Sequence, residues 1–273
     1  MQKSSAENDL RADITQLIVD YAREHNDNEP IAHTWRTPIV RFGDANHPDM
    51  ARLRELVHPE HVLPCEVLPN AKTLIAYFFP FSEEIGNTNR RERLASHEWA
   101  VAYEKTNAAF KELNGEIIAF CNEHGVDAAV PPEAGSYDET ILKSRWSQRH
   151  LAYLCGMGTF GVNNMLITDA GGCGRYATVV TNMDVPHDGP LAEERCLYKR
   201  SGACGACVKR CPSHALTLDG YDRRICNSLC DENAAVHVGL GSSYVLEDTG
   251  GAIVGTNVCG KCVVGVPCTY KIP

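Results

Sequence analysis

The sequence predicts a mixed α/β (α+β) protein with a cysteine-rich C-terminal segment, and three observations carry this prediction. An apolar run, a long helical pattern and a second apolar run follow one another between residues 71 and 132, an order typical of an α/β layer. Glycines cluster at residues 156–174, and nine of the 13 cysteines follow residue 195. We therefore expect an N-terminal helical segment (1–58), an α/β domain (59–190) and a cysteine-rich domain (191–273).

Length, composition and charge exclude several classes of protein. With 273 residues, of which 44% are hydrophobic and 22% charged, the chain can bury one large core or two smaller ones. The N-terminal stretch MQKSSAENDLRADI has no apolar h-region, and no apolar run is long enough to span a bilayer. The net charge of −9, without long runs of Lys or Arg, disfavours nucleic acid as a partner. We expect a cytoplasmic protein that binds neither nucleic acid nor membrane.

Helical patterns dominate the first segment. Apolar residues recur at helical spacing over residues 10–25, which predicts an amphipathic helix. A polar link that contains proline follows at residues 26–38, and DMARLRELV (49–57) predicts a second, short helix.

The α/β domain begins with a buried strand. The run AKTLIAYFFPF (71–81) is apolar and aromatic and ends with Pro80, as expected for a strand buried on both faces. Residues 97–125 form a long helical pattern with Gly125 as the C-cap, and VDAAVPP (126–132) predicts a strand that leaves this helix.

The glycine-rich stretch follows a predicted helix over residues 146–154. Gly156, Gly158 and Gly161 permit tight turns and a close approach of the backbone to a ligand. Although they form a G-x-G-x-x-G pattern, they follow a helix and precede a strand, which is the reverse of the dinucleotide-binding order. MLIT (165–168) and RYATVVTN (175–182) predict a hairpin around DAGGCG. Tight turns alone could explain each glycine, but their density favours the lip of a cofactor site.

The cysteines indicate a metal centre. A cytoplasmic compartment keeps thiols reduced, so disulfides are not expected. Cys65, Cys121, Cys155 and Cys173 stand singly among apolar neighbours and are interpreted as small buried hydrophobic residues. Cys204-x2-Cys207-x3-Cys211-Pro212 instead repeats most of the bacterial ferredoxin run, in which the fourth cysteine binds the other cluster. Ser201 stands where the first cysteine of that run would be, and Cys196 could supply the missing thiolate.

Two [4Fe–4S] clusters need eight thiolates, and the ferredoxin crossover assigns them. One predicted set is Cys196, Cys204, Cys207 and Cys268; the other is Cys211, Cys226, Cys259 and Cys262. Cys230 is left over and could replace Cys226. A pair of four-cysteine zinc sites is the alternative, because C-x2-C pairs also bind zinc.

Several stretches resemble the epoxyqueuosine reductases. AYLCGMGTFGVNNMLIT (152–168), followed by the glycine-rich turn, VVTNMDVP and CGACVKRCPSHAL, is similar to that family's core, with its segment of the form A-G-L-G-x-x-G-K-N-x-x-L-I. VLPNAKTLIAYFFPF is similar to the family's LPGAKSVI strand. RCLYKRSGACGACVKRCP and CGKCVVGVPC resemble more closely still a shorter group of proteins from anaerobes that is grouped with these reductases. The resemblance covers residues 60 to 273.

The resemblance implies a nitroreductase-like α/β domain that binds cobalamin, followed by a ferredoxin-like domain with two clusters. Electrons would pass from the clusters to cobalt, which would drive a reductive step. The implied corrin-binding residues are Gly156, Met157, Gly158, Thr159, Phe160, Gly161, Asn163, Asn164 and Arg175. No D-x-H-x-x-G segment is present, so a histidine ligand on the lower face of the corrin is not indicated.

The sequence departs from the family at three places. The family's proton-donating Asp has no counterpart at the same spacing, and Asp138, Glu139 and His150 are the candidate proton donors here, with Asp138 preferred. Arg149 beside His150 could bind an anionic substrate or serve only the structure. Val162 replaces the family's Lys. The third departure is at the end of the sequence, VPCTYKIP, where the family's helical-repeat segment does not follow. Because this segment is missing and the net charge is negative, we do not expect a tRNA substrate.

Two functions follow. The first is a cobalamin- and iron–sulfur-dependent reductase of a small molecule, supplied with electrons by a ferredoxin or flavodoxin. The second is an electron carrier or reductive activator of a partner protein without a corrin. A flavin (FMN) in the α/β domain is a further alternative, and a homodimer is compatible with the sequence.

Overall fold

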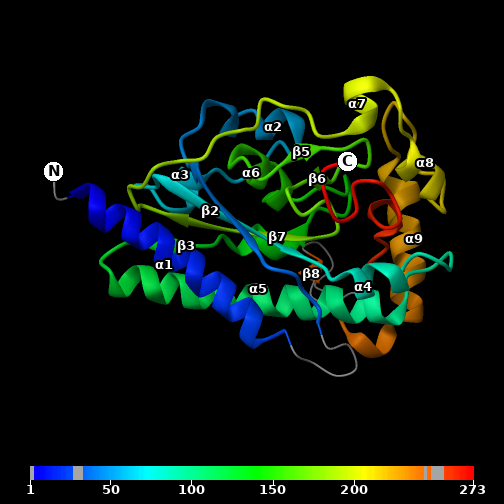
Figure 1. Cartoon of the computed structure of the whole chain (residues 1–273), viewed down its shortest axis with the longest axis horizontal. Coiled ribbons are helices and arrows are strands. Elements are labelled where there is room, and N and C mark those ends of the chain that lie inside the picture. Colours follow the sequence, from blue (N-terminus) through cyan, green and yellow to red (C-terminus); the bar gives the residue numbers. More distant parts are fainter. Residues whose placement is uncertain (1–2, 27–32, 243–244, 247–254) are drawn as a thin grey trace.

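The fold is built on a four-stranded antiparallel sheet in the order β1-β2-β7-β3 (Figure 1). A computed structural model of the chain describes residues 3–26, 33–242, 245–246 and 255–273. The strands of the sheet are β1 (Ile39–Asp44), β2 (Thr73–Pro80), β7 (Gly174–Thr181) and β3 (Ala128–Ala129). Two small sheets accompany it: β4 (Ser136–Tyr137) pairs with β8 (Val245–Leu246), and β5 (Thr159–Phe160) pairs with β6 (Leu166–Ile167).

Helices and 3-10 turns make up the rest of the regular structure in the described residues. The helices are α1 (Lys3–Glu24), α2 (Leu53–Leu56), α3 (Pro64–Val67), α4 (Glu83–Thr88), α5 (His97–Glu123), α6 (Gln148–Leu154), α7 (Leu197–Ser201), α8 (Ala206–Arg210) and α9 (Arg223–Val236). The 3-10 turns are η1 (Pro48–Met50), η2 (Pro132–Gly135), η3 (Val238–Leu240) and η4 (Lys261–Val263). Within the described residues no helix is both long and apolar enough to cross a membrane.

The two faces of the sheet carry separate cores. The helices α1 and α5 cover one face, and α2 and α6 cover the other (Figure 1). Their buried side chains belong to two separate clusters. β2 is buried along its whole length because both faces are covered, as its continuous apolar run predicts. The predicted strand, the helix α5 and the strand β3 follow one another as expected, and Gly125 ends α5 with a φ of +71°.

Three expectations differ from the structure. β6 and β7 do not form a hairpin: β6 pairs with β5, and β7 pairs with β2 and β3, because the buried β7 uses both edges inside the main sheet. Strand β1 was not predicted. Cys65 is exposed rather than buried, since it lies on the short helix α3 at the surface, whereas Cys121, Cys155 and Cys173 are buried as expected. The predicted link (26–38) lies partly outside the described residues.

The cysteine-rich segment gathers at one end of the molecule. Figure 1 shows α7, α8, α9 and the C-terminus together at the end opposite to the N-terminus. The segment is tied to the sheet, because the Gly172 amide donates to the Cys268 carbonyl at 2.8 Å and the Cys173 amide donates to the Thr269 carbonyl at 3.1 Å. The chain around Cys268 therefore lies beside the turn that leads into β7.

Candidate functional site

The first predicted set of cysteines lines one pocket. Cys196 precedes α7, Cys207 lies on α8, and Cys268 comes from the C-terminal segment. Together with Cys204, these side chains line a cavity that is closed on one side by residues 161–163. Residues far apart in the sequence therefore place four thiols around one space, next to the end of the glycine-rich loop.

The second predicted set comes from the end of α8, from α9 and from the segment around η4. Cys211 forms a small buried cluster with Ala215 and Leu216, and Cys226 and Cys262 pack against it together with Cys207 of the first set. Burial raises the pKa of Cys259 to about 11, and the neighbouring Cys226 and Cys211 thiols contribute. Buried thiols of this kind stay protonated until a positively charged centre displaces the proton. Cys259 is therefore better suited to bind a metal centre than to act as a free thiolate.

Cys230 lies beside Cys226 on α9. A hydrogen bond from Cys230 lowers the pKa of Cys226 to about 7, against the effect of burial, and Arg149 and Arg223 act in the same direction. Cys262 has Cys226 among its electrostatic neighbours, and Cys230 has Cys259 among its own. The structure therefore brings both Cys226 and Cys230 next to other cysteines of the second set.

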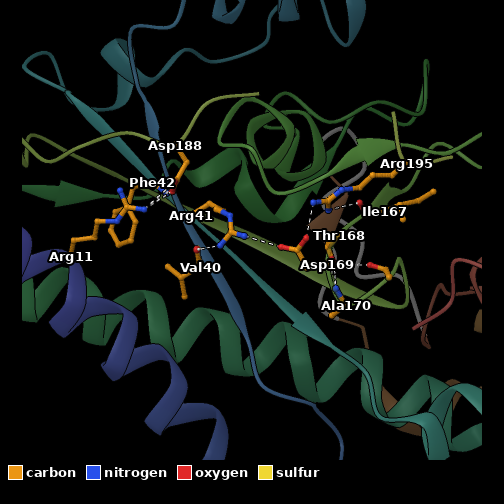
Figure 2. Close-up of polar contacts among 11 residues, drawn as sticks. Arg11, Val40, Arg41, Phe42, Ile167, Thr168, Asp169, Ala170, Asp188 and Arg195 are labelled. Carbon is orange, nitrogen blue, oxygen red and sulfur yellow. Dashed lines mark hydrogen bonds and ion pairs between the residues drawn. The ribbon is translucent and has the colours of Figure 1, made fainter. Parts of the chain in front are cut away.

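A network of charged side chains fixes the start of the cysteine-rich segment (Figure 2). Arg195, which directly precedes Cys196, binds Asp169 at 2.6 Å and the Ile167 carbonyl at 3.0 Å. Arg41 on β1 binds the other oxygen of Asp169 at 2.8 Å. Asp169 therefore connects the sheet to the chain that carries the first cysteine.

Lys261 is a buried cation between Cys259 and Cys262. Its side chain is 2% exposed, and its Nζ donates to the Asn89 carbonyl at 2.9 Å. Asn89 in turn donates from Nδ2 to the Cys259 carbonyl at 2.9 Å. Burial lowers the pKa of Lys261 to about 8, although the nearby Cys259 opposes this shift. Sequence reasoning passed over this residue, yet its position inside CGKC was a signal, since a cation there must lie near two thiols.

The glycines of the loop are explained by contacts within the chain. A Cβ on Gly156 would lie 2.3 Å from the Gly189 carbonyl oxygen, and a Cβ on Gly158 would lie 2.4 Å from the Ile167 carbonyl oxygen. Met157 is fully buried in the core between the sheet and α6. These residues pack against protein and not against an open ligand site. Gly161 differs, because it lines the pocket of the first cysteine set.

The rest of the loop lies toward the cysteine-rich segment. The Thr159 hydroxyl donates to Glu194 at 2.8 Å and accepts from the Arg195 amide. Asn163 donates to the Cys262 carbonyl at 3.0 Å, and Asn164 donates to the Tyr221 hydroxyl at 3.4 Å. The loop therefore contacts both cysteine sets.

The side chain of Arg175 does not point toward the glycine-rich loop. Its guanidinium lies 3.9 Å from the centre of the Tyr103 ring on α5, whereas the loop packs on the face covered by α6. Side chains alternate along a strand, so Arg175 and its neighbour Tyr176 point to opposite faces of the sheet. The structure thus separates this predicted residue from the others.

Asp138 is engaged in local structure. Its carboxylate accepts hydrogen bonds from the Thr140 and Ile141 amides and from His58 at 3.4 Å, and Arg145 lies 3.6 Å away. Burial disfavours its ionised form, but the hydrogen bonds and the Arg145 charge outweigh this and hold the pKa of Asp138 below its usual value. An ionised carboxylate is a poor proton donor.

Glu139 and His150 differ from Asp138. The Oε1 atom of Glu139 is buried and has no hydrogen-bond partner among the described residues. His150 contacts the Ser147 hydroxyl at 2.7 Å, and its ring lies 4.8 Å from that of Phe160. Burial, followed by the charge of Arg149, lowers the pKa of His150 to about 3, so its ring is neutral at pH 7. Of the three candidates, Glu139 is the one with a carboxyl oxygen that no described residue binds.

Comparisons with solved structures place this fold among known proteins. A selenomethionine-labelled epoxyqueuosine reductase has a TM-score of 0.50 at 16% identity, over 94% of this chain and 66% of that one. An epoxyqueuosine reductase with an epoxyqueuosine-modified tRNA-Tyr stem loop has a TM-score of 0.50 at 17% identity, with the same coverage. The enzyme from Streptococcus thermophilus has a TM-score of 0.51 at 16% identity, over 96% of this chain and 67% of that one.

The chain has the epoxyqueuosine reductase fold. It spans 66% of the length of the first two of these reductases, which is just under two thirds. No protein-family model and no curated protein matches the chain. Within the described residues, no three His, Cys, Asp or Glu side chains are grouped as the ligands of a single metal ion. The resemblance to the epoxyqueuosine reductases is thus confirmed for the fold, and it leaves the cofactors and the substrate to be proposed.

Proposed function

We propose that the protein is an iron–sulfur oxidoreductase in which two [4Fe–4S] clusters carry electrons to an acceptor beside residues 160–164. The observation that carries this proposal is the pocket lined by Cys196, Cys204, Cys207 and Cys268, which come from three separate stretches of the chain. The second cluster would be held by Cys211, Cys226, Cys259 and Cys262. When bound, the two clusters would supply one-electron relays.

The protein's own residues would connect the two clusters to the loop. Cys207 and Cys211 lie at opposite ends of one short turn around α8, so the two sets share an element. Asn163 contacts the Cys262 carbonyl, and residues 161–163 close the pocket of the first set. An acceptor held at the loop would therefore lie next to both sets.

Serine variants of the cysteines test this proposal. Cys207→Ser and Cys211→Ser each remove a ligand from one set, so each variant should lose about half of the bound iron, in different clusters. Cys65→Ser is the matched control, because Cys65 is exposed and lies outside both sets. Iron analysis and electron paramagnetic resonance after anaerobic purification would measure the effect. Equal iron content in all three variants would overturn the proposal.

The identity of the acceptor is a separate question. The resemblance implies cobalamin, but three of the implied residues do not fit a corrin site. Gly156 and Gly158 face backbone of the same chain, and Arg175 faces Tyr103 on α5. These contacts argue against a corrin as the acceptor, so the clusters would pass electrons directly to a substrate or, in the second candidate function, to a partner protein. FMN in the same region is the third alternative.

Titration of the anaerobic protein with cob(II)alamin distinguishes these candidates. Binding of the corrin would change the electron paramagnetic resonance spectrum of the cobalt relative to that of the free cofactor. A spectrum identical to that of free cob(II)alamin would exclude a corrin as the acceptor. Titration with FMN, followed by flavin fluorescence, tests the flavin in the same way.

A further inference from the structure

Three basic side chains gather around His150. Lys143 lies in the loop before α6, Arg149 is the neighbour of His150 on α6, and Arg223 begins α9. After burial, the charges that lower the pKa of His150 include those of Arg149, Arg223 and Lys143, together with His61. Elements that are far apart in the sequence therefore bring three cations to one neutral ring.

Contacts among these elements hold the cations in place. Arg149 donates to the Asn164 carbonyl at 2.6 Å, and Asn164 donates to the Tyr221 hydroxyl at 3.4 Å. The guanidinium of Arg223 lies 4.9 Å from the centre of the Tyr221 ring. The neighbouring Arg224 donates to the Thr140 carbonyl at 3.1 Å, which joins the start of α9 to the loop that carries Lys143.

These cations lack carboxylate partners. Among the described residues, Lys143, Arg149 and Arg223 form no ion pair, whereas the nearby Arg145 pairs with both Glu60 and Asp138. The carboxylate of Asp222 is engaged at the start of α9, where it accepts from the Arg224 and Ile225 amides. In a chain with a net charge of −9, three half-buried cations side by side repel one another. An anion bound among them would offset this repulsion.

We propose that Lys143, Arg149 and Arg223 bind the acidic group, a carboxylate or a phosphate, of a small anionic substrate. Guanidinium groups bind both oxyanions through paired hydrogen bonds, which suits Arg149 and Arg223. The substrate would lie between His150 and the second cysteine set, with Glu139 on the same loop as Lys143. This inference rests on the proposed function, because it names the class of substrate that the iron–sulfur protein would reduce.

Calorimetric titration of the anaerobic, iron-loaded protein tests the site. Orthophosphate and succinate serve as probes at constant ionic strength, and the comparison between them distinguishes a phosphate site from a carboxylate site. The variants are Arg149→Gln, Arg223→Gln and Lys143→Gln. The side chains of Arg223 and Lys143 form no hydrogen bond with any described residue. Arg52→Gln is the matched control, because it removes the same charge from an exposed surface pair with Asp49.

We expect at least one probe to bind, and each of the three variants to weaken that binding about tenfold. Arg52→Gln should bind like the wild type, and iron content should be equal in all samples. Equal affinity in wild type and Arg223→Gln would overturn the inference. A change in cluster reduction potential without a change in affinity would also overturn it, because the cations would then be counter-charges for the second cluster. Loss of the proposed function would instead appear as protein without iron, whatever its affinity for the probes.

Discussion

At the residue scale, a buried cation lies next to the proposed second cluster. Lys261 is almost completely buried and is held by Asn89 between two cysteines. A cluster with four thiolate ligands is anionic, so a fixed positive charge beside it should favour the reduced state. Lys261 is therefore interpreted as a residue that sets the potential of this cluster.

Replacing Lys261 by Met should lower the reduction potential of the second cluster. The expected shift is on the order of tens of millivolts for a one-electron couple, since a charge at short range in the protein is screened only in part. Redox titration followed by electron paramagnetic resonance measures it. Lys209→Met, at an exposed site on α8, is the control and should shift the potential less. An equal shift in both variants would show that burial of Lys261 does not matter.

A second buried residue makes the stability of the fold depend on pH. The Ser147 amide donates to Nε2 of His61, and Nδ1 of His61 lies 2.7 Å from the Val62 carbonyl. Because Nε2 must accept, the ring is neutral and Nδ1 carries the proton. Burial lowers the pKa of His61 to about 4, although the Val62 carbonyl opposes this.

The unfolded chain therefore binds a proton at His61 between pH 6.5 and about 4, and the folded chain does not. The free energy of unfolding should fall as the pH drops through this window. A His61→Gln variant should lose part of this pH dependence, although it will be less stable at pH 7. Urea denaturation at pH 7 and pH 5 measures the difference. The same loss of stability with pH in both proteins would contradict the neutral assignment.

At the element scale, the glycine-rich loop shows what a sequence pattern can hide. The spacing of Gly156, Gly158 and Gly161 predicted a close approach of backbone to a ligand. In the structure, the close approach at the first two is to other backbone of the same chain. A pattern of glycines indicates that other atoms lie close to the backbone, but it does not show whether those atoms belong to a ligand or to the protein.

Gly158→Ala should therefore destabilise the fold itself. The added Cβ would lie 2.4 Å from the Ile167 carbonyl oxygen, which is backbone of β6 and cannot move freely. We expect a loss of about 1–3 kcal/mol in the free energy of unfolding. Gly115→Ala is the matched control: it lies inside α5 with open space around it, so it should stabilise by about 0.5–1 kcal/mol. Chemical denaturation compares the two, and a neutral Gly158→Ala variant would show that the contact relaxes.

The strands show the limits of local patterns in another way. β2 and β7 were predicted because each carries a run of apolar and β-branched residues. β1 was not predicted, although its residues alternate between half-buried and buried over much of the strand. The pairing of β7 with β2 and β3, and not with β6, depends on contacts across the sheet that no local pattern encodes.

At the scale of the whole molecule, the cysteine-rich segment is joined to the α/β core. Val258, Val263 and Val264 from this segment are buried in the same core as α1 and α5. The arginines around Asp169 add polar contacts between the sheet and the residue before Cys196 (Figure 2). The division into three segments stays a prediction, and these contacts imply that the last segment depends on the sheet for its position.

The candidate site was predictable where chemistry fixes the spacing. The two sets of four cysteines followed from one motif and the ferredoxin crossover, and their assignment stays a prediction. In the structure, the four cysteines of the first set line one pocket, and Cys226 and Cys262 of the second set pack against Cys211. The residues around them were not predictable, because Lys143, Arg149 and Arg223 meet only after α6 and α9 pack against the same loop. Arg175 was assigned to the site by resemblance alone, and the alternation of side chains along β7 turns it away.

The content of iron, sulfide and zinc in anaerobically purified wild-type protein tests the central claim most directly. Two [4Fe–4S] clusters predict about eight iron and about eight acid-labile sulfide per chain, with little zinc. One or two zinc per chain, with little iron and no sulfide, would contradict the account, because the two cysteine sets would then bind single ions and carry no electrons.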